Sequence, residues 1–217
     1  MELLVVIALV AGLTGWLLRD FGDSSRAAAM RSAQSAVAGV VAIARTKAMS
    51  SAQASRVLLN IDPASSAEPS RYLRYLVVQG FGPGGWQTIT SIYLPNGVYV
   101  VPGDFPSPPD GLFSAEGGSW LRADNTTVLR STVLRSSQIF SAAIASSTVE
   151  KWVGFSLSAV GTTTQSGDLI LASGRARAPG TYSAGDSPVE MVNRDLVCGV
   201  SLSSYGLAVL INDRSSF

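Results

Sequence analysis

Apolar residues fill the first stretch of the chain almost without interruption. Sixteen uncharged, mostly apolar residues separate Glu2 from Arg19. At a rise of about 1.5 Å per residue, this run predicts a helix of roughly 24 Å, a little short of the ~20 residues that usually span a bilayer. A secretory signal peptide is disfavoured, because no Lys or Arg precedes the run and Glu2 has the opposite charge. A single membrane span is the simplest interpretation.

From residue 23 onward the same helix is predicted to become amphipathic. Apolar residues recur in steps of three and four, as on one face of a helix: Met30, Ala33, Val37, Val40, Val41, Ala44 and Ala48. The polar residues expected on the intervening surface are Arg31, Gln34, Ser35, Arg45 and Lys47. No proline interrupts residues 24–54. We therefore expect one helix over residues 1–55, with an apolar half at 2–22 and an amphipathic half at 23–54 that packs on a globular head.

Beyond residue 55 the pattern becomes that of β-strands. Strands are predicted at residues 57–61, 71–78, 86–94, 98–101, 152–157, 168–172, 196–201 and 207–211. In the first of these, Val57, Leu59 and Ile61 alternate with Leu58 and Asn60, which predicts a half-buried strand.

Turn and loop signals separate these strands. Pro95-Asn96-Gly97 lies between two strand-like runs and predicts a hairpin, and the Pro- and Gly-rich residues 102–118 predict an irregular surface loop. Thr-Val-Leu-Arg-Ser occurs twice in succession at 127–136 and is expected in a strand or short helix that leads to Phe140. Residues 56–217 should form a β-rich head. The predicted fold class is α+β, with the long helix packed on a mostly antiparallel sheet.

Composition removes most kinds of active-site chemistry. The formal net charge is +1 and only 14% of residues are charged, so no broad charged surface favours nucleic acid or anionic lipid. Histidine is absent, which excludes a Ser-His-Asp or Cys-His arrangement within the chain. Cys198 is the single cysteine, and its apolar neighbours predict a buried, unreactive thiol. We expect no enzymatic activity, cofactor or metal.

The octet Glu2-Leu-Leu-Val-Val-Ile-Ala-Leu9 resembles the start of type IV pilins and of type II secretion pseudopilins. Precursors in that superfamily carry Gly-Phe-Thr-Leu before a glutamate at the fifth mature position, and a peptidase cuts after the glycine. Met1 would occupy the fourth mature position, so the start codon is expected upstream or the sequence begins inside the motif. The resemblance implies that Glu2 pairs with the N-terminal amine of a neighbouring subunit. The alternative is that Glu2 only favours the start of the helix.

Filament formation would bury the apolar half of the helix among the helices of other subunits. The residues expected in this packing are Leu3, Leu4, Val5, Val6, Ile7, Leu9, Val10, Leu13, Trp16 and Leu17. Gly12, Gly15 and Gly22 are candidate helix breaks, because glycine costs about 1 kcal/mol relative to alanine in a helix interior. Close helix packing through small residues is the alternative explanation. The helix-breaking proline of many pilins is absent, and Gly22 is the best candidate.

Segments toward the C-terminus extend the resemblance. Residues 155–163, 167–174 and 200–206 are similar to the tail of H-class minor pseudopilins and of the minor pilins of natural transformation, where a strand–Gly–strand unit precedes a last hairpin. The resemblance implies a structural subunit, held in the bacterial inner membrane by a single pass and then packed into a periplasmic or extracellular filament of identical subunits or with other pilins. An assembly platform and a cytoplasmic ATPase are implied as partners.

The rival hypothesis is a membrane-tethered, monomeric extracytoplasmic binding module whose helix is only an anchor. Arg19, Arg26 and Arg31 follow the span and no basic residue precedes it, which taken alone would place the C-terminal side in the cytoplasm. A basic leader upstream, as in prepilins, would reverse that orientation.

Two short motifs suggest functions that we do not predict. Gly80-Phe-Gly-Pro-Gly-Gly85 fits a dinucleotide pattern, but a β-like run follows where a phosphate site needs a helix, so a hairpin loop is predicted. Asn125-Thr-Thr127 is a formal glycosylation sequon and indicates only a surface loop.

Two sets of charged residues are also interpreted as solvent-exposed. The first set, which has no calcium-loop spacing, is Asp104, Asp110 and Glu116. The second set, which would bind DNA phosphates only if it converged on one face, is Arg175, Arg177, Arg194 and Arg214.

Overall fold

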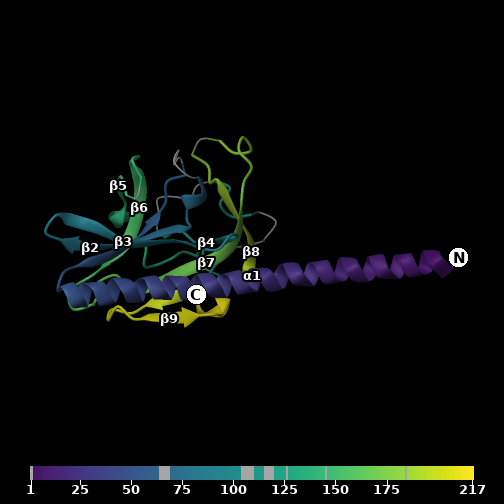
Figure 1. Ribbon diagram of the computed structural model, residues 1–217, viewed down its shortest axis with the longest axis horizontal. Coiled ribbons are helices and arrows are strands. Elements are labelled where there is room, and N and C mark those ends of the chain that lie inside the picture. Colours follow the sequence, from purple (N-terminus) through teal and green to yellow (C-terminus); the bar gives the residue numbers. More distant parts are fainter. Residues whose placement is uncertain are drawn as a thin grey trace.

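In the computed structural model, one long helix lies against two β-sheets (Figure 1). The structure describes residues 2–63, 69–103, 110–114, 120–125, 127–144, 146–183 and 185–217, and for residues 2–24 it describes the backbone alone. The helix, α1 (Glu2–Ser51), is continuous over 50 residues. This arrangement confirms the predicted α+β class.

α1 ends close to the predicted boundary because the next residue reverses the backbone. Ala52 adopts a left-handed conformation with φ 51°, and the Gln53 amide donates to the Ala48 carbonyl at 3.3 Å. This bond satisfies a carbonyl that the last helical turn leaves without an intrahelical partner. The chain enters its first strand at Ser55, so a tight connection joins the helix to the head.

The strands form two antiparallel sheets among the described residues. The first has the order β3-β2-β1-β6-β5. Its strands are β1 (Ser55–Asn60), β2 (Tyr75–Gly82), β3 (Gly85–Tyr93), β5 (Phe140–Ala142) and β6 (Glu150–Leu157). The second has the order β4-β7-β8-β9. Its strands are β4 (Val98–Val100), β7 (Gly167–Ala176), β8 (Val189–Leu202) and β9 (Ala208–Ile211). Short 3-10 helices cover Pro69–Arg71, Ser136–Gln138 and Arg214–Ser216.

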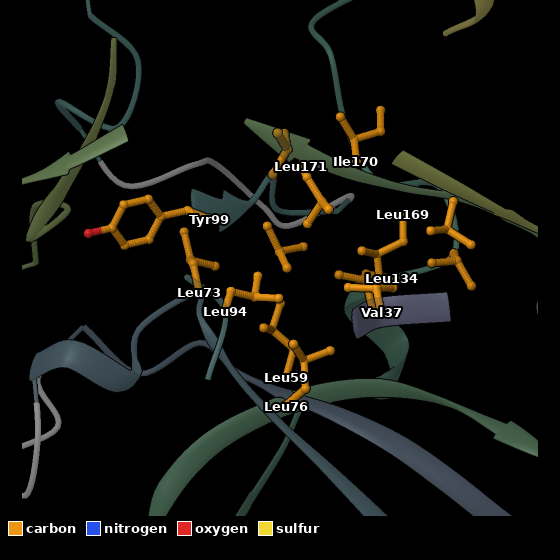
Figure 2. Packing of buried hydrophobic residues seen from close by; sticks show 14 of the residues in the cluster. Val37, Leu59, Leu73, Leu76, Leu94, Tyr99, Leu134, Leu169, Ile170 and Leu171 are labelled. Carbon is orange, nitrogen blue, oxygen red and sulfur yellow. The ribbon is translucent and has the colours of Figure 1, made fainter. Parts of the chain in front are cut away.

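One hydrophobic core joins α1 to both sheets. Val37 of α1 lies in the same cluster as Leu59 and Leu76 of the first sheet and Leu169 of the second (Figure 2). All four side chains are at most 3% exposed. Burying a side chain of this kind contributes about 1.5–3 kcal/mol, so the shared cluster fixes the helix to both sheets at once.

The strand predicted at 71–78 starts later than expected, at Tyr75. Before it, Leu73 has a left-handed backbone with φ 57°. Leu73 is buried, its amide donates to the Asn60 carbonyl at 3.0 Å, and its carbonyl accepts a hydrogen bond from the Val100 amide at 2.8 Å. Leu73 therefore connects β1 of one sheet to β4 of the other, which compensates for a backbone conformation that is unfavourable for leucine.

The hairpin predicted at Pro95-Asn96-Gly97 is wrong. The turn itself forms, since Gly97 has φ 81° and the Val98 amide donates to the Pro95 carbonyl at 3.1 Å. The flanking strands, however, belong to different sheets, because β3 pairs with β2 and β4 pairs with β7. The turn is a corner at which the chain passes from the first sheet to the second.

β1 is buried on both faces, and the prediction of a half-buried strand is wrong. Val57 and Leu59 belong to the main core, yet Leu58 and Asn60 are also at most 2% exposed. Leu58 packs in a second cluster on the other face of the sheet with Tyr75, Val77, Ile144 and Trp152. β1 is the central strand of its sheet, and each of its two faces packs in a separate hydrophobic cluster.

Several other local predictions are confirmed. Residues 80–85 form the turn of the β2–β3 hairpin, with Gly82 opposite Gly85, so a strand follows them and not a helix. The four strands predicted after residue 150 correspond to β6, β7, β8 and β9. The repeat at 127–136 is an exception, because it is not the predicted strand or short helix. It runs through turns and isolated bridges, both of its leucines, Leu129 and Leu134, are buried, and only its last residue belongs to the 3-10 helix that leads to β5. Most of the loop predicted at 102–118 lies outside the described residues.

Candidate functional site

The N-terminal half of α1 extends away from the head (Figure 1). Met30 is the first α1 residue, among those whose side chains are described, that is buried in the core. Residues 2–24 correspond to about 34 Å of helix. α1 therefore has a half that the head covers on one face and a half that projects beyond it.

The predicted site residues lie on this projecting half. Glu2 is the first residue of α1, where the helix dipole favours a carboxylate. The backbone remains α-helical through Gly12, Gly15 and Gly22, so the single chain has no break at these positions, and their melting on assembly stays a prediction. The side chains expected in a filament core lie outside the described ones, and their packing also stays a prediction: Leu3, Leu4, Val5, Val6, Ile7, Leu9, Val10, Leu13, Trp16 and Leu17.

The head-covered half of α1 docks through the predicted apolar stripe, which is confirmed in full. All seven of its side chains are at most 3% exposed: Met30, Ala33, Val37, Val40, Val41, Ala44 and Ala48. They share one core with residues of both sheets. The small Ala33, Ala44 and Ala48 allow the helix backbone to approach the strands closely.

Gln34 was predicted to lie on the surface, and this prediction is wrong because its side chain is buried, with 2% exposed. Its side-chain amide donates to the Gly199 carbonyl of β8 at 2.8 Å and to the Ile211 carbonyl of β9 at 3.0 Å. The signal was present in the sequence, because Gln34 lies one turn after Met30 and two turns before Val41, which are on the buried stripe. Gln34 ties the helix to the last two strands.

Two further polar contacts hold α1 near its C-terminal end. The Ser55 hydroxyl, fully buried at the start of β1, donates to the Ala44 carbonyl at 2.7 Å. The Arg45 guanidinium donates to the Tyr205 carbonyl in the β8–β9 turn at 3.3 Å. Together with Gln34, these bonds position the helix against both sheets, so its axis is fixed relative to the head.

Cys198 is buried as predicted and has no reactive environment. Its sulfur lies 3.8 Å from the Met30 carbonyl, beside α1. Burial raises the pKa of the Cys198 thiol to about 11. The thiol is therefore protonated at neutral pH and acts as a small core residue.

The Ser25–Ser51 part of α1 is long and apolar enough to cross a membrane by length and composition. Its buried stripe belongs to the core of the head, so this part is explained as the core helix of the head. The apolar run that the sequence predicts as a membrane span, residues 2–22, lies on the projecting half.

Of the charged residues considered for other functions, the structure describes Asp110 and the four arginines. Asp104 and Glu116 lie outside the described residues, and within these no three His, Cys, Asp or Glu side chains gather as for a metal ion. Arg175 contacts Glu190 at 2.9 Å, whereas Arg194 and Arg214 both contact Asp195, at 3.7 and 3.1 Å. DNA binding by these arginines stays untested.

Arg177 is only partly exposed, whereas Asn125 of the glycosylation sequon is exposed. Arg177 donates to two backbone carbonyls of its own head, at 3.2 and 3.0 Å. Asn125 is exposed in a turn with φ 56°, as expected for a loop, while Thr126 of the sequon lies outside the described residues.

No protein-family model, curated protein or solved structure matches this chain. The kind of protein is therefore inferred from the architecture of the chain alone. A long N-terminal apolar helix is packed by its second half on an antiparallel β head, and this architecture is pilin-like.

Proposed function

We propose that this chain is a structural subunit of a filament of the type IV pilus or type II secretion pseudopilus kind. Residues 2–22 would hold it in the inner membrane before assembly and pack among the helices of other subunits afterwards. The resemblance of its C-terminal segments points to the H-class minor pseudopilins and transformation minor pilins as the nearest group.

The observation that supports this proposal is the projecting apolar half of one continuous helix. Apolar surface is stabilised by about 25 cal/mol for each Å² removed from water, so lipid or other helices must cover this half. Because α1 is continuous and fixed to both sheets, the head would follow the helix rigidly from the membrane into a filament.

Glu2 provides the test of this function. An acid inside an apolar span costs up to about 2.5–3.5 kcal/mol at the membrane centre and less near its end, so its presence calls for a partner. A bond between opposite charges contributes about 1.5–3 kcal/mol. Glu2→Ala should therefore reduce the yield of sheared filaments by at least about tenfold in the cells that make the protein, as counted by electron microscopy.

Asp20→Ala is the matched control, because it removes an acid from the same helix outside the apolar run. It should leave filament yield unchanged, and both variants should unfold at the wild-type urea concentration, which shows an intact head. Normal filaments from Glu2→Ala would contradict the proposed role of Glu2. If the wild type forms no filaments and an unrelated span of similar length supports full membrane retention, the tethered binding module is the better account.

A further inference from the structure

A cavity opens where α1 leaves the head. Its volume is about 630 Å³, in the range of small-molecule sites, about 300–1,000 Å³. Its wall is formed by Arg26 and Ala29 of α1, by residues 96–98 at the corner between the sheets, and by parts of β7 and β8. Arg26 lies one helical turn before Met30, where the buried stripe of α1 begins. The cavity is therefore at the end of the head from which the apolar half of the helix projects.

A buried serine with an unpaired hydroxyl lines this cavity. Ser173 of β7 is 4% exposed. Its hydroxyl forms no hydrogen bond with any other residue that the structure describes. Buried polar side chains nearly always have a hydrogen-bond partner. The Ser173 hydroxyl is thus available to a polar ligand in the cavity.

Two asparagines add further hydrogen-bond donors to the wall. The side-chain oxygen of Asn193 accepts hydrogen bonds from the amides of Asp195 and Leu196, at 2.9 and 3.1 Å. The side-chain oxygen of Asn96 accepts one from the Arg74 guanidinium at 2.8 Å. Because both oxygens are engaged with the head itself, the side-chain NH₂ groups are the parts of these residues that can serve a ligand.

Two arginines bring positive charge to the cavity. Arg175 lies two residues after Ser173 on β7, so both side chains are on the same face of the strand. Its Nε and Nη2 each lie 2.9 Å from Oε2 of Glu190, which orients the guanidinium and leaves Nη1 for a ligand. Arg26 is exposed on the α1 side, and no described residue that lines the cavity is acidic. Although Glu190 neutralises one of the two charges, this set of donors favours an oxyanion such as phosphate.

The cavity also lies at a defined depth relative to a membrane, and here the inference rests on the membrane attachment in the proposed function. Residues 2–22 form roughly 30 Å of helix, which is the thickness of the hydrocarbon layer. Arg26 follows residue 22 by about 6 Å along the helix, and each head-group layer is about 5–8 Å deep. Arg26 and the cavity would therefore face the lipid head groups around the helix.

We propose that this cavity binds the phosphate group of a phospholipid from the membrane that holds the apolar half of α1. Arg26 and Arg175 contact the phosphate oxygens, and the Ser173 hydroxyl and the two asparagine amides donate to the phosphate or to the adjoining glycerol ester. The acyl chains extend beside the projecting helix into the bilayer. A lipid bound in this way fixes the rotation of the head relative to the membrane surface.

Native mass spectrometry of the full chain in an uncharged detergent counts the lipid molecules that remain bound. With dihexanoyl phosphatidylglycerol as the probe, the wild type should bind one molecule per chain. Ser173→Ala should weaken binding by at least about tenfold, because a hydrogen bond to a charged group is lost. Its urea midpoint without lipid should stay that of the wild type, since the hydroxyl is bonded to none of the described residues. The double variant Arg26→Gln and Arg175→Gln should weaken binding at least as much.

Arg31→Gln is the matched control for the loss of charge. Arg31 is exposed on α1, five residues after Arg26, and is not part of the cavity wall. The variant should bind the lipid as the wild type does. Equal binding by the wild type, Ser173→Ala and the double variant would overturn the site, and an equal loss in Arg31→Gln would show attraction by overall charge and overturn it too.

Competition identifies the part of the lipid that is recognised. Dihexanoylglycerol, which has the same acyl chains without phosphate, should not displace the lipid. Inorganic phosphate, which has the same charge chemistry without acyl chains, should require a concentration at least about tenfold higher than phosphatidylglycerol. Equal displacement by dihexanoylglycerol overturns phosphate as the recognised group, and equal displacement by inorganic phosphate overturns the lipid as the ligand.

The outcomes also separate the lipid site from the proposed function. A wild type that stays in the membrane during alkaline washing and assembles filaments but binds no lipid overturns the site alone. Lipid bound at the site of a chain that never forms filaments supports the site and contradicts only the filament role. Release of the wild type from membranes by alkaline washing rejects the membrane attachment and this inference together.

Discussion

Gln34 is expected to be the polar residue on which helix docking depends most. Gln34→Ala removes one buried and one partly buried hydrogen bond, at 2.8 and 3.0 Å, to the carbonyls of Gly199 and Ile211. Each such bond contributes about 0.5–1.5 kcal/mol, and the lost methylene adds about 0.8 kcal/mol. The free energy of unfolding of the head should fall by about 2–4 kcal/mol. Ser35→Ala, at the exposed neighbouring position, should stay within about 0.5 kcal/mol of wild type.

Gln34→Glu adds a dependence on pH that a purely steric role would not produce. A carboxylate would face two carbonyl oxygens without a donor, so burial and repulsion should raise its pKa in the folded state above the ~4.3 of an unfolded glutamate. A raised folded pKa gives stability below the unfolded pKa that is lost as pH rises. The loss of stability relative to wild type should therefore be small near pH 4 and grow toward pH 7.

Urea unfolding of the full chain in detergent, followed by the fluorescence of the buried Trp120 and Trp152, measures both effects. The slope of free energy against urea should not change, so that a shift of the midpoint reports stability alone. If Gln34→Ala matches Ser35→Ala, or if the Gln34→Glu difference is constant between pH 4 and 7, the assigned role of Gln34 is wrong.

Two further predictions concern the fit of α1 and its strands. Gly199→Ala should destabilise the head by about 1–3 kcal/mol, because the added Cβ would lie 2.5 Å from the Leu169 carbonyl oxygen and 2.9 Å from the Phe217 ring. Gly39→Ala, where the added Cβ meets nothing within 4 Å, should stabilise the head by up to about 1 kcal/mol. Equal urea midpoints for the two variants would contradict this prediction. Cys198, whose thiol pKa is about 11, should react with a thiol reagent at pH 8 only as fast as the head unfolds, and rapid labelling of folded protein would show that the site is open.

The helix was predictable because its signal is local. The apolar stripe from Met30 to Ala48 repeats at the helical period, and every member is buried. Gln34 was placed on the surface because it is polar, although its spacing puts it on the stripe. Its partners are carbonyls 165 and 177 residues away in the sequence. No local pattern reveals them, because a backbone acceptor leaves no trace in the side-chain sequence.

The strands were predictable, but their partners were not. The turn at Asn96 and Gly97 has the expected conformation, yet turn residues determine only that the chain reverses and not which strand it joins next. β4 pairs with β7, whose residues follow some 70 positions later. The double burial of β1 has a similar cause, because Leu58 is covered by side chains such as Ile144 that come from distant segments.

The two ends of the chain show the same division. Glu2 and the apolar run stand out in the sequence by their charge and hydropathy alone. The exposure of β9 does not, because residues 207–211 have the composition of a buried strand. Only its place at the end of the strand order β4-β7-β8-β9 leaves Val209 and Leu210 exposed.

The way α1 is attached to the head determines how the protein responds to mechanical force. Gln34 holds the helix to β8 and β9 near one end of the head, and the Ser55 hydroxyl holds it to β1 near the other. A pull along the helix axis would load these bonds and the apolar stripe together, in shear, so that none breaks first. A sideways pull would load the contact with the edge strand β9 before the others. The subunit should therefore transmit tension along its helix and yield most easily across it.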